Sequence, residues 1–491
     1  MPRRKLRILF ASSEVDPFIK TGGLADVASA LPKAMAKLGC DIRVIMPKYQ
    51  TIPENYQVKM KNLTSFTVPL GWRQQYCGVD KMILDNITYY FIDNEYYFKR
   101  DKIYGHYDDG ERFAFFAKAI CTSLAYLDDF KCDILHCNDW HTALVPVYLR
   151  ESFKDDPLYA NIKTIFTVHN TKFQGIYSDY MLSDVLGLHY YKAAVDQLYH
   201  KYKAINYMKG ALSYSDLITT VSPSYAEEIK TKTYGEGLDE IFSRRHQVLH
   251  GIINGIDNDQ YDPATDKLIV QPFTIDTIKE KHKNRQAIRK ELGLDINTND
   301  PLVIIISRLS EQKGMELIKH VMHEIVSLPM QFVILGTGDK EYEDMFRYWA
   351  NLHSNKMAAC ITFDSALSHR LYAGADLLLM PSQFEPCGLS QMIAMRYGVL
   401  PIVREVGGLK DSVIAYDRFA KTGTGFSFAN YNAHEFLYTV TDAVDIYHNN
   451  QDDWNILVTN AMATDFSWEK SARQYLSLYQ SLKPEVYGYY K

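Results

Sequence analysis

The chain has 491 residues, too many for one ordinary hydrophobic core, so we expect at least two domains. Its 47% hydrophobic and 23% charged residues are typical of a globular protein and exclude a disordered one. The net charge of −5 comes from 54 Lys and Arg against 59 Asp and Glu, and this near balance argues against a nucleic-acid-binding protein, which needs a basic face.

Membrane segments and paired cysteines are also missing from the sequence pattern. No apolar run is long enough to span a bilayer, and the apolar stretch after the basic start is too short for a signal peptide. The seven cysteines are scattered and form no Cys-x-x-Cys pair, which favours reduced thiols. We therefore expect a cytoplasmic protein without a membrane partner.

The first half of the chain alternates short buried strands with helices. A helix is predicted over residues 27–38, where Gly39 ends it, and another over 111–127. Residues 66–98 break the rhythm and suggest extra strands or a hairpin. Ser222 followed by Pro223 is a typical helix start. Buried strands are predicted at residues 8–11, 41–46, 134–137, 164–168 and 217–221.

The second half repeats the rhythm after a polar, proline-containing stretch over residues 254–300, and we place the domain boundary near the start of that stretch. Alternating strands and helices predict a parallel sheet covered on both faces. The last helix, from residue 467 on, has one apolar stripe that either domain could cover. Strands are predicted at residues 302–306, 332–335, 361–363, 377–380 and 400–403.

Two doubly wound α/β domains bind ligands at the carboxyl ends of their strands, and the candidate residues follow strands. Residues 20–26 read KTGGLAD, between a strand and a helix. Paired glycines let a backbone approach a ligand, a helix start favours an anion, and Lys20 adds a positive charge. The spacing fits neither a dinucleotide fingerprint nor a Walker A loop, so a plain turn and a phosphate site remain equally good interpretations.

Similar candidates follow the strands of the second half. Arg308 and Lys313 flank a turn that enters a helix, where two cations suit a diphosphate, although solvated surface charges are the plainer interpretation. Glu385 lies in a loop that opens a helix over residues 390–397; such a carboxylate is often only structural, but in a cleft it could bind hydroxyls or balance charge. The glycine turns at 335–339 and 407–409 lie at the same sheet edge.

The histidine-rich segment HCNDWH, residues 136–141, precedes TVHN at 167–170. No spacing in this cluster matches a metal-ligand pattern, so no metal is expected there. A histidine at a strand end, such as His169, is more often a packing residue than a catalyst. The chain has no Ser-His-Asp order, no Gly-x-Ser-x-Gly elbow and no kinase motif set.

Taken in order, these motifs resemble those of bacterial glycogen synthases and plant starch synthases, and the resemblance covers essentially the whole chain. It implies the GT-B fold, in which two Rossmann-like doubly wound domains face a deep cleft. The domains implied are 1–253 on the acceptor side, 254–466 on the nucleotide-sugar side, and a helix at 467–491 that crosses back to the first domain. The motifs that carry the resemblance are KTGGLAD, HCNDWH, TVHN, NGID at 254–257, SRLSEQKG at 307–314, FEPCGL at 384–389 and GGL at 407–409.

The resemblance implies a glycosyltransferase that moves glucose from ADP-glucose to the non-reducing end of an α-1,4-glucan, with retention of configuration. From the first domain it implies substrate contacts by Lys20, Gly22, Gly23, Asp26, Tyr104, Asp139 and His169. From the second domain it implies contacts by Asn254, Arg308, Lys313, Glu385, Cys387, Gly388, Leu389, Gly407 and Gly408. Glu385, His169, Arg308, Lys313 and Asp139 are the catalytic candidates, and Tyr104 would lie near the donor base.

The chemistry of the residues agrees with this resemblance. Lys20, Arg308 and Lys313 can neutralise a departing diphosphate, so we expect neither a metal nor a cofactor. Retention suggests a carboxylate nucleophile, for which Glu385 is the only strong candidate. We prefer front-face attack, with the leaving phosphate taking the acceptor proton and Glu385 stabilising positive charge on the sugar. The competing interpretations are a GT-B enzyme for a UDP-sugar and a small acceptor, and a non-catalytic glucan-binding protein.

Overall fold

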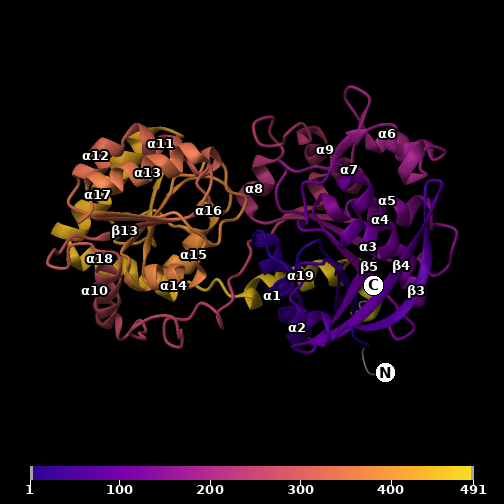
Figure 1. The fold of residues 1–491 in the computed structure, drawn as a ribbon, viewed down its shortest axis with the longest axis horizontal. Helices are drawn as coiled ribbons and strands as arrows, with labels where there is room; N and C mark the ends of the chain where they lie inside the picture. Colours follow the sequence, from indigo (N-terminus) through magenta and orange to yellow (C-terminus); the bar gives the residue numbers. More distant parts are fainter. Residues whose placement is uncertain (1–3, 488–491) are drawn as a thin grey trace. The chain divides into compact units, whose positions relative to one another are not determined.

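The computed structural model describes residues 4–487 and divides into two compact units (Figure 1). The first unit consists of the chain up to Asn254 together with the segment from Trp468 on, and the second unit comprises Gly255–Ser467. Within the described residues no helix is both long and apolar enough to cross a membrane.

The first unit is built on a sheet whose strands, over the described residues, follow the order β12-β11-β7-β6-β1-β2-β5-β4-β3. The strands from β12 to β5 pair in parallel, while β3, β4 and β5 form an antiparallel edge, the hairpin region expected from the sequence. A small second sheet has the order β8-β10-β9. The strands are β1 (Arg7–Ala11), β2 (Asp41–Pro47), β3 (Lys61–Leu70), β4 (Arg73–Leu84), β5 (Ile87–Asp93), β6 (Ile134–Asn138), β7 (Lys163–Val168), β8 (Ile176–Ser178), β9 (Tyr199–His200), β10 (Ala204–Asn206), β11 (Leu217–Thr220) and β12 (Leu249–Gly251).

Helices cover both faces of this sheet. The chain moves from β1 to β2 in one direction and from β6 to β7 in the other, so right-handed crossovers place α1 and α5 on opposite faces. The core strands are buried on both sides, which is why they are nearly continuous apolar runs. The helices are α1 (Gly23–Lys37), α2 (Glu54–Gln57), α3 (Glu95–Phe98), α4 (Asp109–Ser123), α5 (Leu144–Glu151), α6 (Lys192–Leu198), α7 (Tyr207–Tyr214), α8 (Pro223–Glu228), α9 (Asp239–Arg244), α19 (Trp468–Leu482) and α20 (Pro484–Tyr487).

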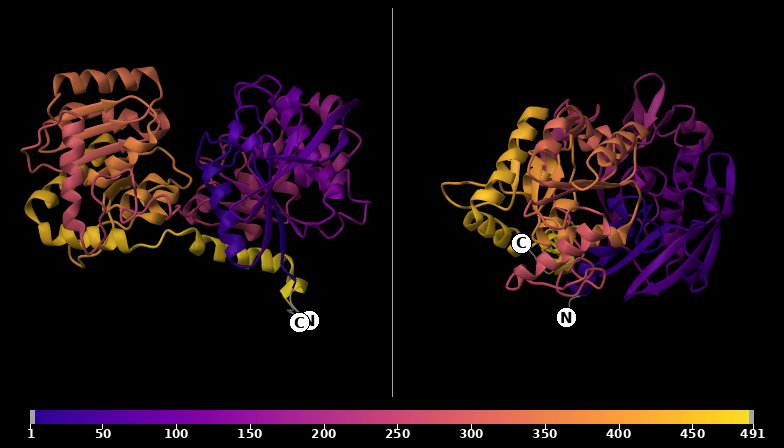
Figure 2. Two further views of the ribbon diagram at one scale, coloured as in Figure 1. Left: turned by 60° about the horizontal axis from the view of Figure 1, so that its bottom comes forward. Right: turned by 60° about the vertical axis from the view of Figure 1, so that its left-hand side comes forward.

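The helix α19 packs against the first unit, beside α1 (Figure 2). The Tyr479 hydroxyl forms a 2.6 Å hydrogen bond with Nδ1 of His136 on β6, and the Ser471 hydroxyl donates a 2.7 Å bond to the Ile253 carbonyl. The apolar stripe, which the sequence left without an assigned partner, is therefore buried in this unit.

The second unit contains a parallel sheet in the order β15-β14-β13-β16-β17-β18. Figure 1 shows α11, α12 and α13 on one face of it, and α14 and α15 on the other. Its strands are β13 (Leu302–Ile306), β14 (Gln331–Leu335), β15 (Met357–Cys360), β16 (Leu377–Met380), β17 (Leu400–Arg404) and β18 (Phe426–Phe428). Its helices are α10 (Lys281–Glu291), α11 (Met315–His320), α12 (Met322–Ser327), α13 (Lys340–Leu352), α14 (Ser365–Gly374), α15 (Ser390–Arg396), α16 (Gly407–Ser412), α17 (Ala433–Asn449) and α18 (Gln451–Ala463).

One expectation about local structure was wrong. The strand expected at residues 361–363 lies earlier, at Met357–Cys360, where Ala358 and Ala359 pair with β14. Phe363 is 88% exposed, so its apolar character does not mark a buried strand. The helix α10 lies in the polar stretch over residues 254–300, where no helix was predicted, because most of its residues are charged or polar and only a few of its positions are buried.

Candidate functional site

In each of the two large sheets there is one place where the strand order reverses. In the first unit it lies between β1 and β6, and in the second between β13 and β16. The loops that follow such strands diverge to opposite faces of the sheet and leave a crevice at its carboxyl edge, where α/β proteins bind ligands. The segments that contain Lys20, Asp139, Arg308 and Glu385 follow these four strands.

The loop that contains Lys20 and Gly22 is exposed and unobstructed. Gly22 has extended backbone angles, φ −163° and ψ −169°, which any residue can adopt. A Cβ atom there would meet nothing within 4 Å in the described structure, so the fold itself does not require glycine. α1 begins at Gly23, and Lys20 forms a 2.5 Å ion pair with Asp26 in its first turn. The loop therefore keeps backbone N–H groups and a lysine accessible to a ligand.

A buried carboxylate, Glu14, holds this loop in place. It accepts hydrogen bonds from the Thr21 N–H at 2.6 Å, the Thr21 hydroxyl at 2.8 Å and the Tyr104 hydroxyl at 2.8 Å. The Tyr104 hydroxyl also bonds Ser13 at 2.7 Å, its ring stacks on His141, and burial raises its pKa well above the usual range. Tyr104 thus braces the loop. Sequence reasoning missed Glu14, although it stands just beyond the first strand.

Asp139 and His169 meet at the carboxyl ends of β6 and β7. Asp139 has a positive φ of 56°, an uncommon backbone conformation for this residue that is often found at functional sites. Its Oδ1 accepts a 2.8 Å bond from the His169 N–H. Burial raises the Asp139 pKa to about 7 and lowers that of His169 to about 3. The His169 ring, 3.0 Å from the Asn138 side chain, is therefore neutral and suited to hydrogen bonding rather than to carrying charge.

The other histidines of the motif serve the core. His136 is fully buried between Tyr479 and Thr167, each 2.6 Å away, and burial lowers its pKa to about 3. His141 packs against the aromatic rings of Tyr104 and Trp140. Among the described residues no group of three or more His, Cys, Asp and Glu could hold a metal ion.

Asn254, the last residue of the first unit, is only 6% exposed. Its Oδ1 has no hydrogen-bond partner among the described residues. Buried polar atoms are nearly always satisfied by protein, water or ligand, so this oxygen is a candidate for an external partner.

In the second unit, two loops are locked together at the carboxyl ends of β13 and β16. Arg308 is exposed directly after β13, and Gly314 follows Lys313 with a φ of +79°. A Cβ atom on Gly314 would lie 2.0 Å from the Pro381 carbonyl oxygen, so only glycine fits there. The Gln383 N–H also donates a 2.8 Å bond to the Gln312 carbonyl. The turn that carries Lys313 is thereby fixed against the loop that carries Glu385.

Lys313 and Glu385 form the strongest charged contact of this edge. Nζ of Lys313 donates to Oε2 of Glu385 at 2.5 Å, and the Ser382 hydroxyl donates to the same oxygen at 3.2 Å. The side chains are only 17% and 8% exposed. A cation and a carboxylate held side by side in a largely desolvated place can stabilise opposite charges that develop on one reacting bond.

The glycine turn at Gly407 and Gly408 supports the Glu385 loop from behind. A Cβ atom on Gly407 would lie 2.1 Å from the Glu385 carbonyl oxygen, and one on Gly408 would lie 2.1 Å from that of Cys387. The Gly408 N–H donates a 3.1 Å bond to the Glu385 carbonyl. These two glycines therefore pack on the backbone of the loop, an arrangement the sequence did not reveal.

The residues after Glu385 lead into α15. Cys387 is buried, and Gly388 has a φ of +73° with the Gln391 side chain directly beneath it. The Gln391 amide donates to the Cys387 and Gly388 carbonyls at 3.1 and 3.0 Å. Leu389 is the residue before α15 begins, so α15 anchors the end of the loop.

Comparison with known proteins places this arrangement in a family. Residues 7–244 match the family described as starch synthase catalytic domain, and 284–455 match glycosyl transferases group 1. A glycogen synthase from Clostridium novyi (strain NT) is 47% identical over 97% of this chain and 99% of its own. The chain belongs to the glycogen synthase and starch synthase family. A glycogen synthase from Geobacillus stearothermophilus is 48% identical over 97% of this chain and 98% of the relative.

Two solved structures agree with this fold. The catalytic domain of starch synthase IV from Arabidopsis thaliana, bound to ADP and acarbose, superposes with a TM-score of 0.89 at 33% identity and covers 98% of this chain and 99% of that one. A sucrose-phosphate synthase from Thermosynechococcus elongatus shares the fold, with a TM-score of 0.60 at 17% identity, 98% of this chain and 100% of that one. The family, the GT-B class of two Rossmann-like domains, and the glycosyltransferase class are thus confirmed as predicted from the motifs.

Proposed function

We propose that the two groups of residues described above carry out the reaction of a glycogen synthase. The chain transfers glucose from ADP-glucose to an α-1,4-glucan and releases ADP. The observation that carries the residue assignment is the Lys313–Glu385 pair, which lies in the loops that follow β13 and β16, where the strand order reverses.

Arg308 and Lys313 bind the diphosphate and stabilise the charge that grows on it as the glucose–phosphate bond breaks. Arginine binds phosphate as a fork and lysine as a point charge. Because Lys313 is held by Glu385 before the reaction, it needs little reorganisation in the transition state. The two cations take the place of a divalent ion, so the reaction needs no metal and no cofactor.

Glu385 stabilises the positive charge that develops on the sugar. Its pairing with Lys313 and the Ser382 hydroxyl engages the oxygen Oε2. A carboxylate held in this way is a weaker nucleophile, and this favours front-face attack, with the leaving phosphate accepting the proton of the acceptor hydroxyl. The Gln391 amide, which donates to the Cys387 and Gly388 carbonyls just before Leu389, and the turn at Gly407 and Gly408 keep the loop of this carboxylate in position.

The first unit, which runs to Asn254 and resumes at Trp468, supplies the acceptor side, and the second unit, Gly255–Ser467, supplies the donor side. Lys20, Gly22, Gly23 and Asp26 form the loop that approaches the donor. Asp139, His169 and Asn254 offer hydrogen bonds to sugar hydroxyls, since His169 is neutral and the Asn254 oxygen lacks a partner among the described residues. We also place the enzyme in the cytoplasm, where its cysteines, none of which forms a disulfide in the described chain, stay reduced.

Incubation with glucose-labelled ADP-glucose and glycogen tests this proposal. We expect label in α-1,4-linked terminal glucose, unchanged rates after chelator treatment, and lower kcat/KM with UDP-glucose. Preferred transfer from UDP-glucose to a small aglycone would favour the other GT-B reaction. Glycogen binding without turnover of any nucleotide sugar would indicate a non-catalytic glucan-binding protein, and loss of activity in a chelator restored by Mg²⁺ would refute the metal-free mechanism.

A further inference from the structure

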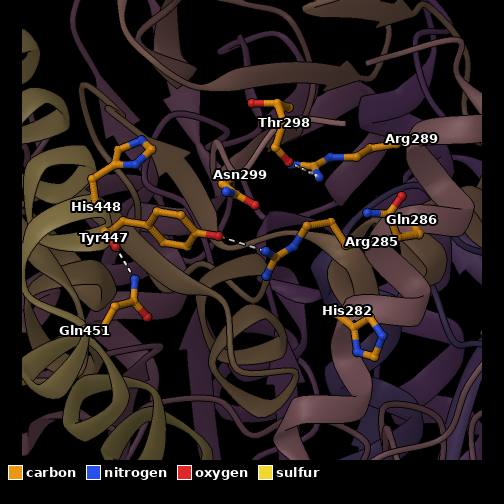
Figure 3. A pocket seen from close by; sticks show the side chains of 9 residues that line it. All are labelled: His282, Arg285, Gln286, Arg289, Thr298, Asn299, Tyr447, His448 and Gln451. Carbon is orange, nitrogen blue, oxygen red and sulfur yellow. Dashed lines mark hydrogen bonds between the residues drawn. The ribbon is translucent and has the colours of Figure 1, made fainter. Parts of the chain in front are cut away.

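A polar pocket of about 410 Å³ opens in the second unit (Figure 3). It lies between α10, the loop before β13, and the junction of α17 with α18. None of the residues that line it in the described part of the chain is acidic. They are His282, Arg285, Gln286, Arg289, Thr298, Asn299, Tyr447, His448 and Gln451.

Two arginines stand one helical turn apart on the wall formed by α10. Arg285 is fully engaged, because it pairs with Asp376 and donates a 2.8 Å bond to the Tyr447 hydroxyl. Arg289 donates to the carbonyls of Thr298 and Asp300 at 3.0 and 2.6 Å. It is only 2% exposed, and its Nε has no hydrogen-bond partner among the described residues.

The charge of Arg289 is only partly compensated by Asp376 and Asp300. Burial lowers its pKa, and the neighbouring Arg285 lowers it further. The acidic groups near the pocket have other partners. Asp376 pairs with Arg285 and accepts a hydrogen bond from the Leu302 N–H, and the Asp300 carboxylate lies 3.7 Å from the His448 ring. A buried guanidinium N–H without a partner among the described residues, beside a pocket that no acidic side chain lines, favours binding of an anion there.

The pocket lies at the opposite end of the sheet from Arg308 and Glu385. Asp376, which holds Arg285, directly precedes β16, and its second oxygen accepts a 2.9 Å bond from Leu302, the first residue of β13. These are the amino ends of the two strands whose carboxyl ends lead to Arg308 and Glu385. A ligand here therefore does not compete with a nucleotide at the carboxyl edge.

We propose that this pocket binds a small phosphate-bearing anion, of the size of a hexose phosphate. Its volume lies within the range of about 300–1,000 Å³ found for small-molecule sites. Arg289 supplies the charge that attracts the phosphate. The amides of Gln286, Asn299 and Gln451 with the imidazole of His282, which line the same pocket, offer hydrogen bonds to hydroxyl groups (Figure 3).

The test compares two near-isosteric substitutions in one loop. Asn299→Asp places a carboxylate inside the pocket, whereas Asn297→Asp makes the same charge change two residues away, at an exposed position that does not line it. Each variant and the unsubstituted enzyme are saturated with ADP, which fills the nucleotide site. They are then titrated calorimetrically with inorganic phosphate, fructose 6-phosphate or fructose.

We expect saturable binding of phosphate or fructose 6-phosphate, none of fructose, and an affinity at least about tenfold weaker in Asn299→Asp but unchanged in Asn297→Asp. Tighter binding of fructose 6-phosphate than of phosphate would identify a sugar phosphate as the ligand class, and equal binding would identify phosphate itself. The proposal is wrong if the ADP-saturated enzyme binds neither anion or if both variants bind them equally. Because ADP stays bound throughout, such a failure leaves the proposed catalytic function untouched.

Discussion

The glycines beside the candidate residues of the two units have different physical reasons to be glycine. Gly314, Gly407 and Gly408 in the second unit would each bring a Cβ atom to within about 2 Å of a carbonyl oxygen of a neighbouring loop. Gly22 in the first unit has extended backbone angles and free space around it in the described structure. The second unit thus uses glycine to build a rigid loop, whereas the first keeps a surface clear.

The candidate lysines of the two units also differ in how deeply they are buried. Both form a 2.5 Å ion pair, Lys20 with Asp26 and Lys313 with Glu385. The first pair is exposed and screened by water, and exposed pairs contribute only about 0–1 kcal/mol. The second is largely buried, and its electrostatic interaction is correspondingly stronger. We infer that the second unit is preorganised for charge, whereas the first unit keeps its lysine accessible to the substrate.

The largest expected effect concerns the cations of the second unit. Replacing Arg308 or Lys313 by Ala should lower kcat by about 10²–10³, by analogy with the loss of one oxyanion-hole donor. Because both act on one leaving group, the double variant should lose less than the product of the single losses. Steady-state kinetics with ADP-glucose measures this, and Arg347→Ala, an exposed arginine on α13, is the control. Near-normal kcat in both folded single variants would remove these residues from the active site.

The glycine comparison predicts opposite outcomes for one chemical change. Gly408→Ala should lower the unfolding free energy by about 1–3 kcal/mol, because its methyl group collides with the Cys387 carbonyl. Gly22→Ala should leave stability unchanged but lower kcat/KM, because its methyl group fills space meant for substrate. Thermal melts and kinetics on both variants decide the matter. Equal melting temperatures for the two would break the distinction between a structural and a functional glycine.

Acid should weaken the first unit through its buried neutral histidines. The pKa of His136 is lowered to about 3 by burial, so the folded protein binds fewer protons than the unfolded chain between pH 3 and 6.5. Stability from this group is present above pH 6.5 and is lost as the pH falls, by about 2 kcal/mol between pH 7 and 5. Urea unfolding at pH 7 and pH 5 measures the unfolding free energy at each pH, and its decrease between the two should be smaller for His136→Gln than for the unsubstituted enzyme. The substitution His246→Gln, at an exposed position, should behave like the unsubstituted enzyme. If His136→Gln loses as much unfolding free energy between pH 7 and 5 as the unsubstituted enzyme does, the assignment is wrong.

The smallest effect concerns the thiol beside the carboxylate. Cys387 is buried in the Glu385 loop, so bound ADP should slow its alkylation a few-fold by restricting opening of that loop. Cys360, which ends β15 in the same unit, serves as the internal control and should react at the same rate with and without ADP. Mass spectrometry of the labelled peptides measures both rates. Equal protection of the two thiols would indicate a general tightening of the unit, and no protection of either would make Cys387 a packing residue alone.

Much of the fold was determined by the sequence itself. The strands that precede Lys20, Asp139, Arg308 and Glu385 are apolar runs buried on both faces, and such runs are visible without a structure. The exceptions were elements that carry little apolar signal, as with the charged α10, or the wrong apolar signal, as with the exposed Phe363 after β15. The ordered motifs were specific enough to indicate the family and the GT-B class.

What only the tertiary structure decided is how these residues meet. Glu14 joins Thr21 to Tyr104, Gly408 supports the Glu385 loop, and Arg289 keeps a buried N–H without a described partner. Each of these contacts joins residues far apart in the chain or depends on burial. Local spacing carries no information about which distant backbone will approach a glycine, or which charge will lose its water. The sequence therefore determined which chemistry is present, and the packing of distant loops decided which groups are fixed, paired or left open to a ligand.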